Sequence, residues 1–380
     1  MATNVYGNGA NSTAGANTIV HYYDRAGVKA ANRVNIYGQF ADRKSMPKKM
    51  GKTFKISKFL HMYDRALNDA EFAAKGFLSA RSVAEVNTAL SNATLSEGAG
   101  AVNKRSLQKV TMETSLARYG EMIDYSDEVE LFSEDAIQVR YREELGELAN
   151  SRMEDLIQLD MLSTGTVMYA GSATAIDEID ADSTVSYDLI RKAVRKLVRN
   201  RAQKTTQMVT GSTKIDTQTV AKAYYAIIGA NVKGDLETLT RGTVADNGTT
   251  EFVYIPAHKY GSAATLAEGE VGAMHEVRFI ESEAAVVYAG EGADATGYTG
   301  TLSVTSGNFD VFPILFPTQG SFATVGLKGQ GKIKFNAKSP EAVENANPYG
   351  TNGFFSYNFF YAGIVLEEEK LLKVLVSASA

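Results

Sequence analysis

Cysteine is absent from the 380-residue chain, and its absence removes whole classes of chemistry. A protein without cysteine forms no disulfides, offers no thiolate ligands to a metal and has no cysteine nucleophile. Any covalent cross-link must therefore use other side chains. The composition is compatible with folding in a reducing cytosol.

Long apolar runs are also absent. No run of about 18 apolar residues is present that could span a bilayer as a helix. The opening sequence MATNVYGNGANSTAGANT lacks the basic and then apolar pattern of a signal peptide. We therefore expect a protein that is made in the cytoplasm and has no membrane partner.

An excess of positive charge is lacking as well, because 39 Lys and Arg residues face 44 Asp and Glu residues, for a net charge of −5. Affinity for nucleic acid rests mainly on neutralisation of phosphates by Lys and Arg. The balance therefore disfavours a dedicated nucleic-acid binder. The length allows a sizeable core in about two or three domains.

Phosphate-binding motifs are incomplete. The GKT at Gly51–Thr53 resembles the end of a P-loop, but Met46 stands where that motif needs a glycine. GLKGQGK at Gly326–Lys332 lies among predicted strands and has no helix N-terminus to offer a phosphate. We interpret it as a glycine-rich strand or loop.

Other catalytic and metal-binding patterns are missing too. The four histidines are far apart in the sequence: His21, His61, His258 and His275. None has a second histidine at the spacing of a zinc-binding helix, and no serine lies in a G-x-S-x-G elbow. The acidic segment Asp177–Ser183 lacks the spacing of a calcium loop. We expect no enzymatic activity, no metal site and no cofactor.

The longest uninterrupted helical pattern runs from Ser133 to Thr164. Its apolar residues recur at steps of three and four, which places them on one face of a helix: Ile137, Tyr141, Leu145, Leu148, Leu156 and Leu159. Arg152 falls in the same row. Ser133 predicts an N-cap and Gly165 a left-handed C-terminal cap. Such a helix would be about 45 Å long, which suggests a strut.

Before this helix, two segments alternate apolar and polar residues, at 52–59 and 108–116, as half-solvated strands do. A polar excursion from Asp64 to Arg105, rich in Ala, Ser and Gly, lies between them. The pattern predicts a long projecting β arm. Gly120, in the connection to the helix, suggests a bulge or tight bend.

The second half of the chain predicts an α/β or α+β domain. Residues 186–201 predict an amphipathic helix with one basic side and an apolar side made by Leu189, Ile190, Ala193, Val194, Leu197 and Val198. The basic side could meet phosphates or an acidic membrane, but we expect it to find carboxylates of the same or a neighbouring subunit. Gly290–Gly300 predicts a flexible loop, and the last residues predict an aromatic and then an apolar strand.

These features together favour a self-assembling structural protein. The first 18 or so residues have the composition of a free arm. Projecting strands and arms leave unpaired edges and apolar faces that need partners. We expect removal of residues 1–45 or Asp64–Arg105 to leave a soluble subunit that does not assemble.

The order of the segments resembles a known family. The similarity is carried by YDRAGVKAANRVNIYGQFADRKSMPKKMGKTFKI, by TLSEGAG, by SLARYGEMIDYSDEVELFSEDAIQVRYREELGELANSRMEDLIQLDMLSTGTVMYAG, and by LIRKAVRKLVRN and YYAII. It covers about residues 20–230. The chain resembles major capsid proteins of tailed bacteriophages with the Hong Kong 97-type fold, and more narrowly those of N4-like phages.

The resemblance implies an α+β fold with an N-arm, an extended β E-loop, a peripheral domain with a long spine helix, and an axial domain. The implied boundaries are 1–50 for the N-arm, 51–125 for the E-loop with adjoining peripheral strands, 126–170 for the peripheral domain with the spine helix, 171–330 for the axial domain and 331–380 for a return to the peripheral sheet.

The resemblance also implies partners. Subunits would form hexamers and pentamers of an icosahedral shell around double-stranded DNA, without sequence-specific binding, and would meet scaffolding, portal and decoration proteins. The shell would be made in the host bacterial cytoplasm. Candidate intersubunit contacts are Lys52, Lys55, Lys58, Glu113, Arg152, Arg191 and Arg195. The alternatives are a nanocompartment shell, a tail subunit or an α/β enzyme.

Overall fold

The structure is a computed structural model. It describes residues 36–59, 82–95, 97–98, 103, 107, 109–132, 137–209, 217–240, 253–260, 266–328, 333–340 and 348–380. The predicted free arm, the predicted cap at Ser133 and part of the Asp64–Arg105 excursion lie outside these residues.

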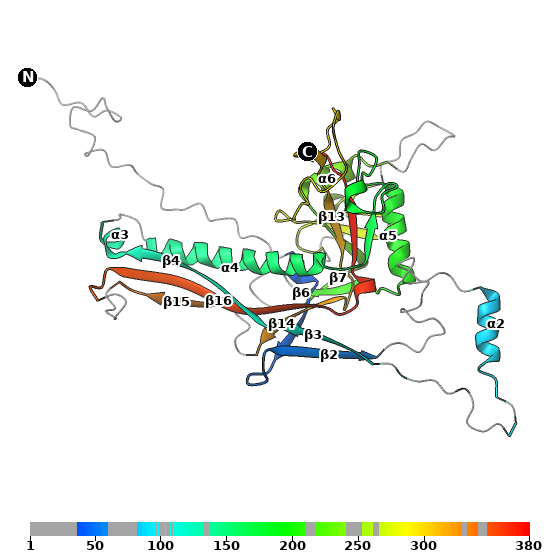
Figure 1. Ribbon diagram of the computed structural model, residues 1–380, viewed down its shortest axis with the longest axis horizontal. Coiled ribbons are helices and arrows are strands. Elements are labelled where there is room, and N and C mark those ends of the chain that lie inside the picture. The colour runs from blue at the N-terminus through cyan, green and yellow to red at the C-terminus, as the bar shows by residue number, and fades with distance from the viewer. Residues whose placement is uncertain are drawn as a thin grey trace, which may run out of the picture. The chain divides into compact units, whose positions relative to one another are not determined.

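The chain is a mixed α+β protein, as the sequence predicted (Figure 1). Its helices are α2 (Val83–Ser91), α3 (Asp127–Phe132), α4 (Ile137–Leu162), α5 (Tyr187–Arg199) and α6 (Ala230–Glu237). Single 3-10 turns lie at η3 (Tyr37–Gln39), η4 (Ile176–Glu178), η5 (Ala257–Lys259) and η6 (Glu368–Lys370).

One sheet is organised around the aromatic strand β16. Its five strands are β1 (Asp42–Met46), β14 (Phe322–Leu327), β16 (Asn352–Val365), β15 (Lys334–Lys338) and β4 (Ala117–Ser126). Every second residue of β16 is buried from Gly353 to Tyr361, as expected where one face of a sheet is covered. Helix α4 packs along β16 on that face (Figure 1).

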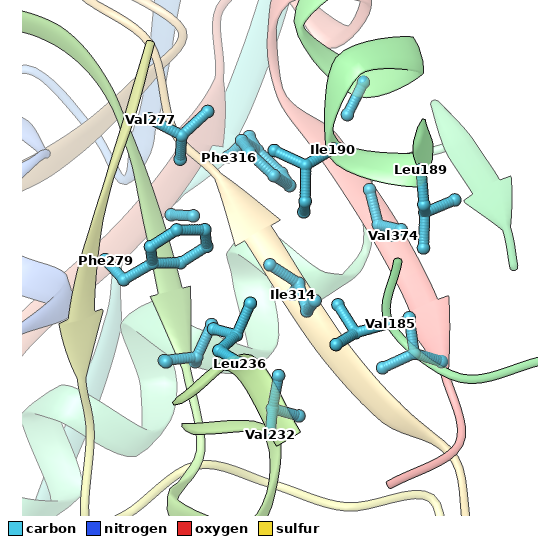
Figure 2. Packing of buried hydrophobic residues seen from close by; sticks show 14 of the residues in the cluster. Val185, Leu189, Ile190, Val232, Leu236, Val277, Phe279, Ile314, Phe316 and Val374 are labelled. Carbon is cyan, nitrogen blue, oxygen red and sulfur yellow. The ribbon is translucent and has the colours of Figure 1, made fainter. Parts of the chain in front are cut away.

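The second sheet has eight strands. They are β5 (Val167–Tyr169), β17 (Leu372–Val376), β13 (Phe312–Phe316), β7 (Thr217–Ile228), β10 (Val277–Glu281), β9 (Glu270–Met274) and β8 (Ile255–Pro256) in that order, with β6 (Thr205–Val209) paired to β7. Every residue of β13 is buried. Helices α5 and α6 contribute to one core with this sheet, where Ile190 and Leu236 lie near Ile314 (Figure 2).

Two small ribbons complete the described chain: β2 (Thr53–Phe59) with β3 (Lys109–Ser115), and β11 (Val304–Thr305) with β12 (Asn308–Phe309). The pairing of β2 with β3 confirms that the two alternating segments form strands. The last fifty residues are divided between the sheets, because β15 and β16 belong to the five-stranded sheet and β17 to the eight-stranded one.

The buried row of α4 differs from the prediction. Leu159 is 56% exposed, and Arg152 also faces solvent. The buried residues recur at steps of four: Leu145, Ala149, Ile157 and Met161, with Met153 partly buried. The prediction is right at Leu145, which is buried, and at Tyr141, Leu148 and Leu156, which are partly buried against the same core. Beyond Leu145 it misses the centre of the buried face, because that face contains a small residue, Ala149, and two buried polar residues, Glu154 and Gln158.

Two glycine predictions are also wrong. Gly165 is not left-handed; its N–H donates to Oε1 of Glu368 at 2.7 Å, and a side chain there would collide with that carboxylate. Gly120 is no bulge, because it pairs with Asn358 in an unbroken register. A Cβ at Gly120 would lie 2.5 Å from the Tyr357 carbonyl oxygen, so glycine permits close strand contact.

The expected flexible loop at Gly290–Gly300 is held by hydrogen bonds. Asp310, which is 5% exposed, accepts from the Gly290 N–H at 2.7 Å and from Ser303 Oγ at 2.6 Å. Ala295 N–H donates to the Gly307 carbonyl at 2.8 Å. In α5, the predicted apolar face is buried except for Val198, which is 55% exposed.

Candidate intersubunit surfaces

The β2–β3 ribbon brings two of the predicted contact residues together. Lys55 lies opposite Glu113 in the antiparallel register, and their side chains form an ion pair of 2.8 Å. The Lys55 ammonium donates a hydrogen bond that lowers the pKa of Glu113. Both side chains are about 60% exposed (62% and 61%), so this face of the ribbon is open to a partner.

The other face of the ribbon packs against the five-stranded sheet of the same chain. Phe54, Ile56 and Met112 contact a cluster that includes Val325 and Ile364. Alternation of polar and apolar residues creates this division, because successive strand side chains point to opposite faces. The described part of the ribbon is therefore anchored to its own sheet.

The remaining two ribbon lysines differ in environment. Lys58 Nζ donates to the Leu366 carbonyl at 3.0 Å and lies 3.9 Å from Glu369 Oε1, so this side chain contacts its own chain. The Lys52 side chain is exposed, while its carbonyl accepts from the Leu116 N–H at 2.9 Å. The structure thus brings Lys55 and Glu113 together and holds Lys58 and Lys52 apart from them.

Helix α2 lies in the excursion between the two ribbon strands. It begins with a capping box, in which Ser82 Oγ accepts from the Glu85 N–H at 3.2 Å and Glu85 Oε2 accepts from the Ser82 N–H at 2.7 Å. It buries no residue, and its apolar residues Val83 and Leu90 are 78% and 63% exposed. A nine-residue helix without tertiary packing is marginal in water.

Arg152 forms ion pairs within its own chain, at the surface. Its Nε lies 3.1 Å from Glu121 Oε1 on β4, and its Nη1 lies 3.6 Å from Asp155. The hydrogen bond to Glu121 raises the pKa of Arg152. The side chain is 53% exposed, so the pair links α4 to β4 at the surface.

Helix α5 presents the two remaining predicted residues. Ser186 Oγ caps the helix by accepting from the Leu189 N–H at 3.2 Å. Arg191 pairs with Asp188 at 3.2 Å and lies over the ring of Tyr187. Arg195 is exposed on the same outward side.

A buried carboxylate that the sequence did not reveal fixes η3 to α4. Glu154, 9% exposed, accepts from the Tyr37 N–H at 2.7 Å and the Gly38 N–H at 3.2 Å. Burial raises its pKa to about 7, against the opposing effect of these N–H groups. Gln158 also contacts the Tyr37 hydroxyl at 2.8 Å. The signal available in the sequence was the position of Glu154 between the apolar residues Met153 and Ile157.

The described residues hold no group of three or more His, Asp or Glu side chains arranged for a metal ion. His258 and His275 are both exposed, and His275 lies edge-on to Tyr187. In the acidic segment after β5, Asp180 accepts from Ser183 Oγ at 2.8 Å, which is a local turn contact. No helix within the described ranges is long and apolar enough to cross a bilayer.

Comparison with known proteins gives a relative across almost the whole chain. The major capsid protein of Pseudomonas phage KPP21 is 30% identical over 375 residues, which cover 95% of this chain and 93% of the relative. No protein-family model matches.

Solved structures with a similar fold are also phage capsids. The capsid of Ralstonia phage GP4 superposes with a TM-score of 0.62 at 11% identity, covering 98% of this chain and 99% of the other. The head structure of Helicobacter pylori bacteriophage KHP40 gives 0.52 at 8% identity, with 97% of each chain covered. The cyanophage Pam1 capsid gives 0.51 at 13% identity over the full length of both chains.

Proposed function

This chain belongs to the major capsid proteins of phages, and from that premise we propose that it builds the icosahedral shell of a tailed phage from hexamers and pentamers. As a phage major capsid protein it is a structural component of the virion capsid and not an enzyme. The observation that carries the proposal is 30% identity over 95% of the chain to another major capsid protein. That relationship favours a capsid over a tail or nanocompartment subunit.

We further propose the Hong Kong 97-type domain plan, with the N4-like phages as the narrower family. In this plan α4 is the spine helix, the five-stranded sheet is its peripheral domain and the β2–β3 ribbon is the base of the E-loop. The eight-stranded sheet with α5 and α6 is the axial domain. Strand β14 lies before residue 330 but belongs to the five-stranded sheet, and β17 lies after it but belongs to the eight-stranded sheet. We therefore assign β14 to the peripheral domain and β17 to the axial domain.

The open surfaces supply the intersubunit contacts in this proposal. The exposed Lys55–Glu113 face, Lys52 and the apolar residues of α2 would lie against a neighbouring subunit, while Arg152, Arg191 and Arg195 add surface charge. Lys58 contributes indirectly by fixing the ribbon to its own sheet. Many modest contacts of this kind add up to a large interface while each remains reversible.

The partners follow from the same proposal. The net charge of −5 suits a shell that encloses double-stranded DNA without binding it tightly, because few phosphates would be neutralised. Scaffolding, portal and decoration proteins would join the shell during or after its assembly.

Negative-stain microscopy of the full chain, expressed alone and with a scaffold candidate from the same genome, tests the function. Closed icosahedral particles of uniform size are the expected result. Open tubes would favour a tail protein, and discrete small oligomers under both conditions would contradict the shell proposal.

A further inference from the structure

The outward side of α5 carries two cations, Lys192 and Arg195, that no described residue neutralises. Its inward residues, including Ile190, Ala193 and Leu197, are fully buried against the eight-stranded sheet. Lys192 and Arg195 point to the other side, are exposed, and have no ion pair among the described residues. The nearest acidic residue on the helix, Asp188, is paired with Arg191.

The same side has the mixed character of a protein-binding surface. Val198 is 55% exposed next to these cations, and Tyr187 lies under the Arg191 guanidinium at 5.6 Å. A phosphate ligand would make no favourable contact with the exposed valine, and the Asp188 carboxylate would repel the phosphate. An interface with protein would bury the valine and the tyrosine ring while pairing the cations.

A complementary set of charges lies near the start of α4. Glu143, Glu144 and Glu147 follow one another within about one turn, and none forms an ion pair among the described residues. The nearby Arg142 lies over the Phe355 ring at 5.3 Å. Glu144 and Glu147 are three positions apart in the sequence, as are Lys192 and Arg195, so each pair lies on one side of its helix and the two pairs can meet when the helices lie alongside each other.

We propose that the basic side of α5 docks onto the Glu143–Glu147 acidic surface of α4 in a second copy of this chain. The inference rests on the proposed shell, which brings many identical copies together. It goes further by naming both surfaces of one intersubunit contact. Each contact is salt-sensitive, since charge pairs at a rim are screened.

A charge-swap experiment tests the pairing. The full-length double variant K192E/R195E should lower the yield of closed particles at least tenfold at low salt, measured by sedimentation and microscopy. Adding E144K/E147K to the same chain should restore the yield, because every interface then carries the reversed pairs. The control K222E/K259E changes the charge equally at two exposed lysines and should assemble normally.

The outcomes separate this inference from the proposed function. If the wild-type chain forms no shells with a scaffold, the function fails. If it forms shells and K192E/R195E does so equally well, or if the fourfold variant does not regain assembly, the inference is overturned. Loss of packaged DNA from K192E/R195E particles that still assemble normally would instead assign the surface to phosphate. Circular dichroism of the unassembled subunits checks that the variants fold.

Discussion

At the scale of single residues, Glu154 is the only buried carboxylate among those that the structure describes in α4. It is 9% exposed and holds the backbone of η3, the first described segment of the chain, against the helix. Arg43 contributes a favourable charge and Asp155 an unfavourable one. Tyr37 and Gln158 complete the contact. A buried carboxyl in this position makes the attachment of η3 depend on pH.

The Glu154→Gln variant should remove that dependence. Burial raises the folded-state pKa of Glu154 to about 7, so the folded subunit keeps a proton that the unfolded chain releases near its ordinary pKa. Stability is therefore fully present below the unfolded pKa and falls as pH rises towards 7. The loss should be about 2 kcal/mol between pH 5 and pH 8.

Urea unfolding of the unassembled subunit at several pH values measures this effect. Glutamine keeps the shape but cannot ionise, and it loses one N–H acceptor, so E154Q should be less stable than wild type at pH 5. The difference should shrink or reverse by pH 8. A difference that stays constant across this range would show that Glu154 does not titrate as described.

At the scale of elements, two glycines in neighbouring elements should respond to alanine in opposite ways. At Gly120 in β4, a Cβ would lie 2.5 Å from the carbonyl oxygen of Tyr357, and backbone cannot move aside cheaply. At Gly146 in α4, the nearest atom is Phe335 Cζ at 4.0 Å. Gly120→Ala should cost about 2 kcal/mol or more, and Gly146→Ala should add about 1 kcal/mol of stability.

Thermal unfolding of the two single variants checks the sign of each change. Gly146→Ala serves as the control, because it makes the same substitution in the helix that packs on this sheet, at a site with space for a methyl group. Equal destabilisation of both variants would contradict the close β4–β16 contact.

The elements also show which parts of the fold can be predicted from the sequence. The alternating segments, α5 and the apolar strand β17 were predictable, because each carries a strong period or an unbroken apolar run. The row of α4 was not, since Glu154 is buried only through its contact with Tyr37 and Gly38, over a hundred residues away. Gly120 and Gly165 were misread for the same reason: their role depends on Tyr357 and Glu368, which approach only in the fold. The candidate contacts at Lys55 and Glu113 could be named but not paired until the register was known.

At the scale of the whole molecule, the described N-terminal residues belong to the folded subunit. Ile36, Tyr37, Phe40 and Ala41 are all buried, and β1 pairs with β14. A deletion of residues 1–45 would therefore remove part of the core, which corrects the expectation of a soluble subunit.

A deletion ending at residue 35 keeps η3 and β1. We expect the 1–35 deletion to unfold at the same urea concentration as wild type but to form no closed shells, and normal particles would contradict a role for that segment in assembly.

The exposed apolar side of α2 allows a test of whether the segment between β2 and β3 contacts a neighbouring subunit. Val83 and Leu90 are 78% and 63% exposed, so V83S/L90S should leave the unfolding midpoint of the unassembled subunit unchanged. In the proposed shell these side chains are buried by a neighbour, and each loses about 1–2 kcal/mol of burial on substitution. Because the contact repeats at every subunit, shell yield should fall sharply, as measured by sedimentation of the assembled fraction. Asn87→Ala, on an exposed polar position of the same helix, is the matched control and should assemble normally. Equal shell yields from V83S/L90S and wild type would show that α2 stays in solvent in the shell.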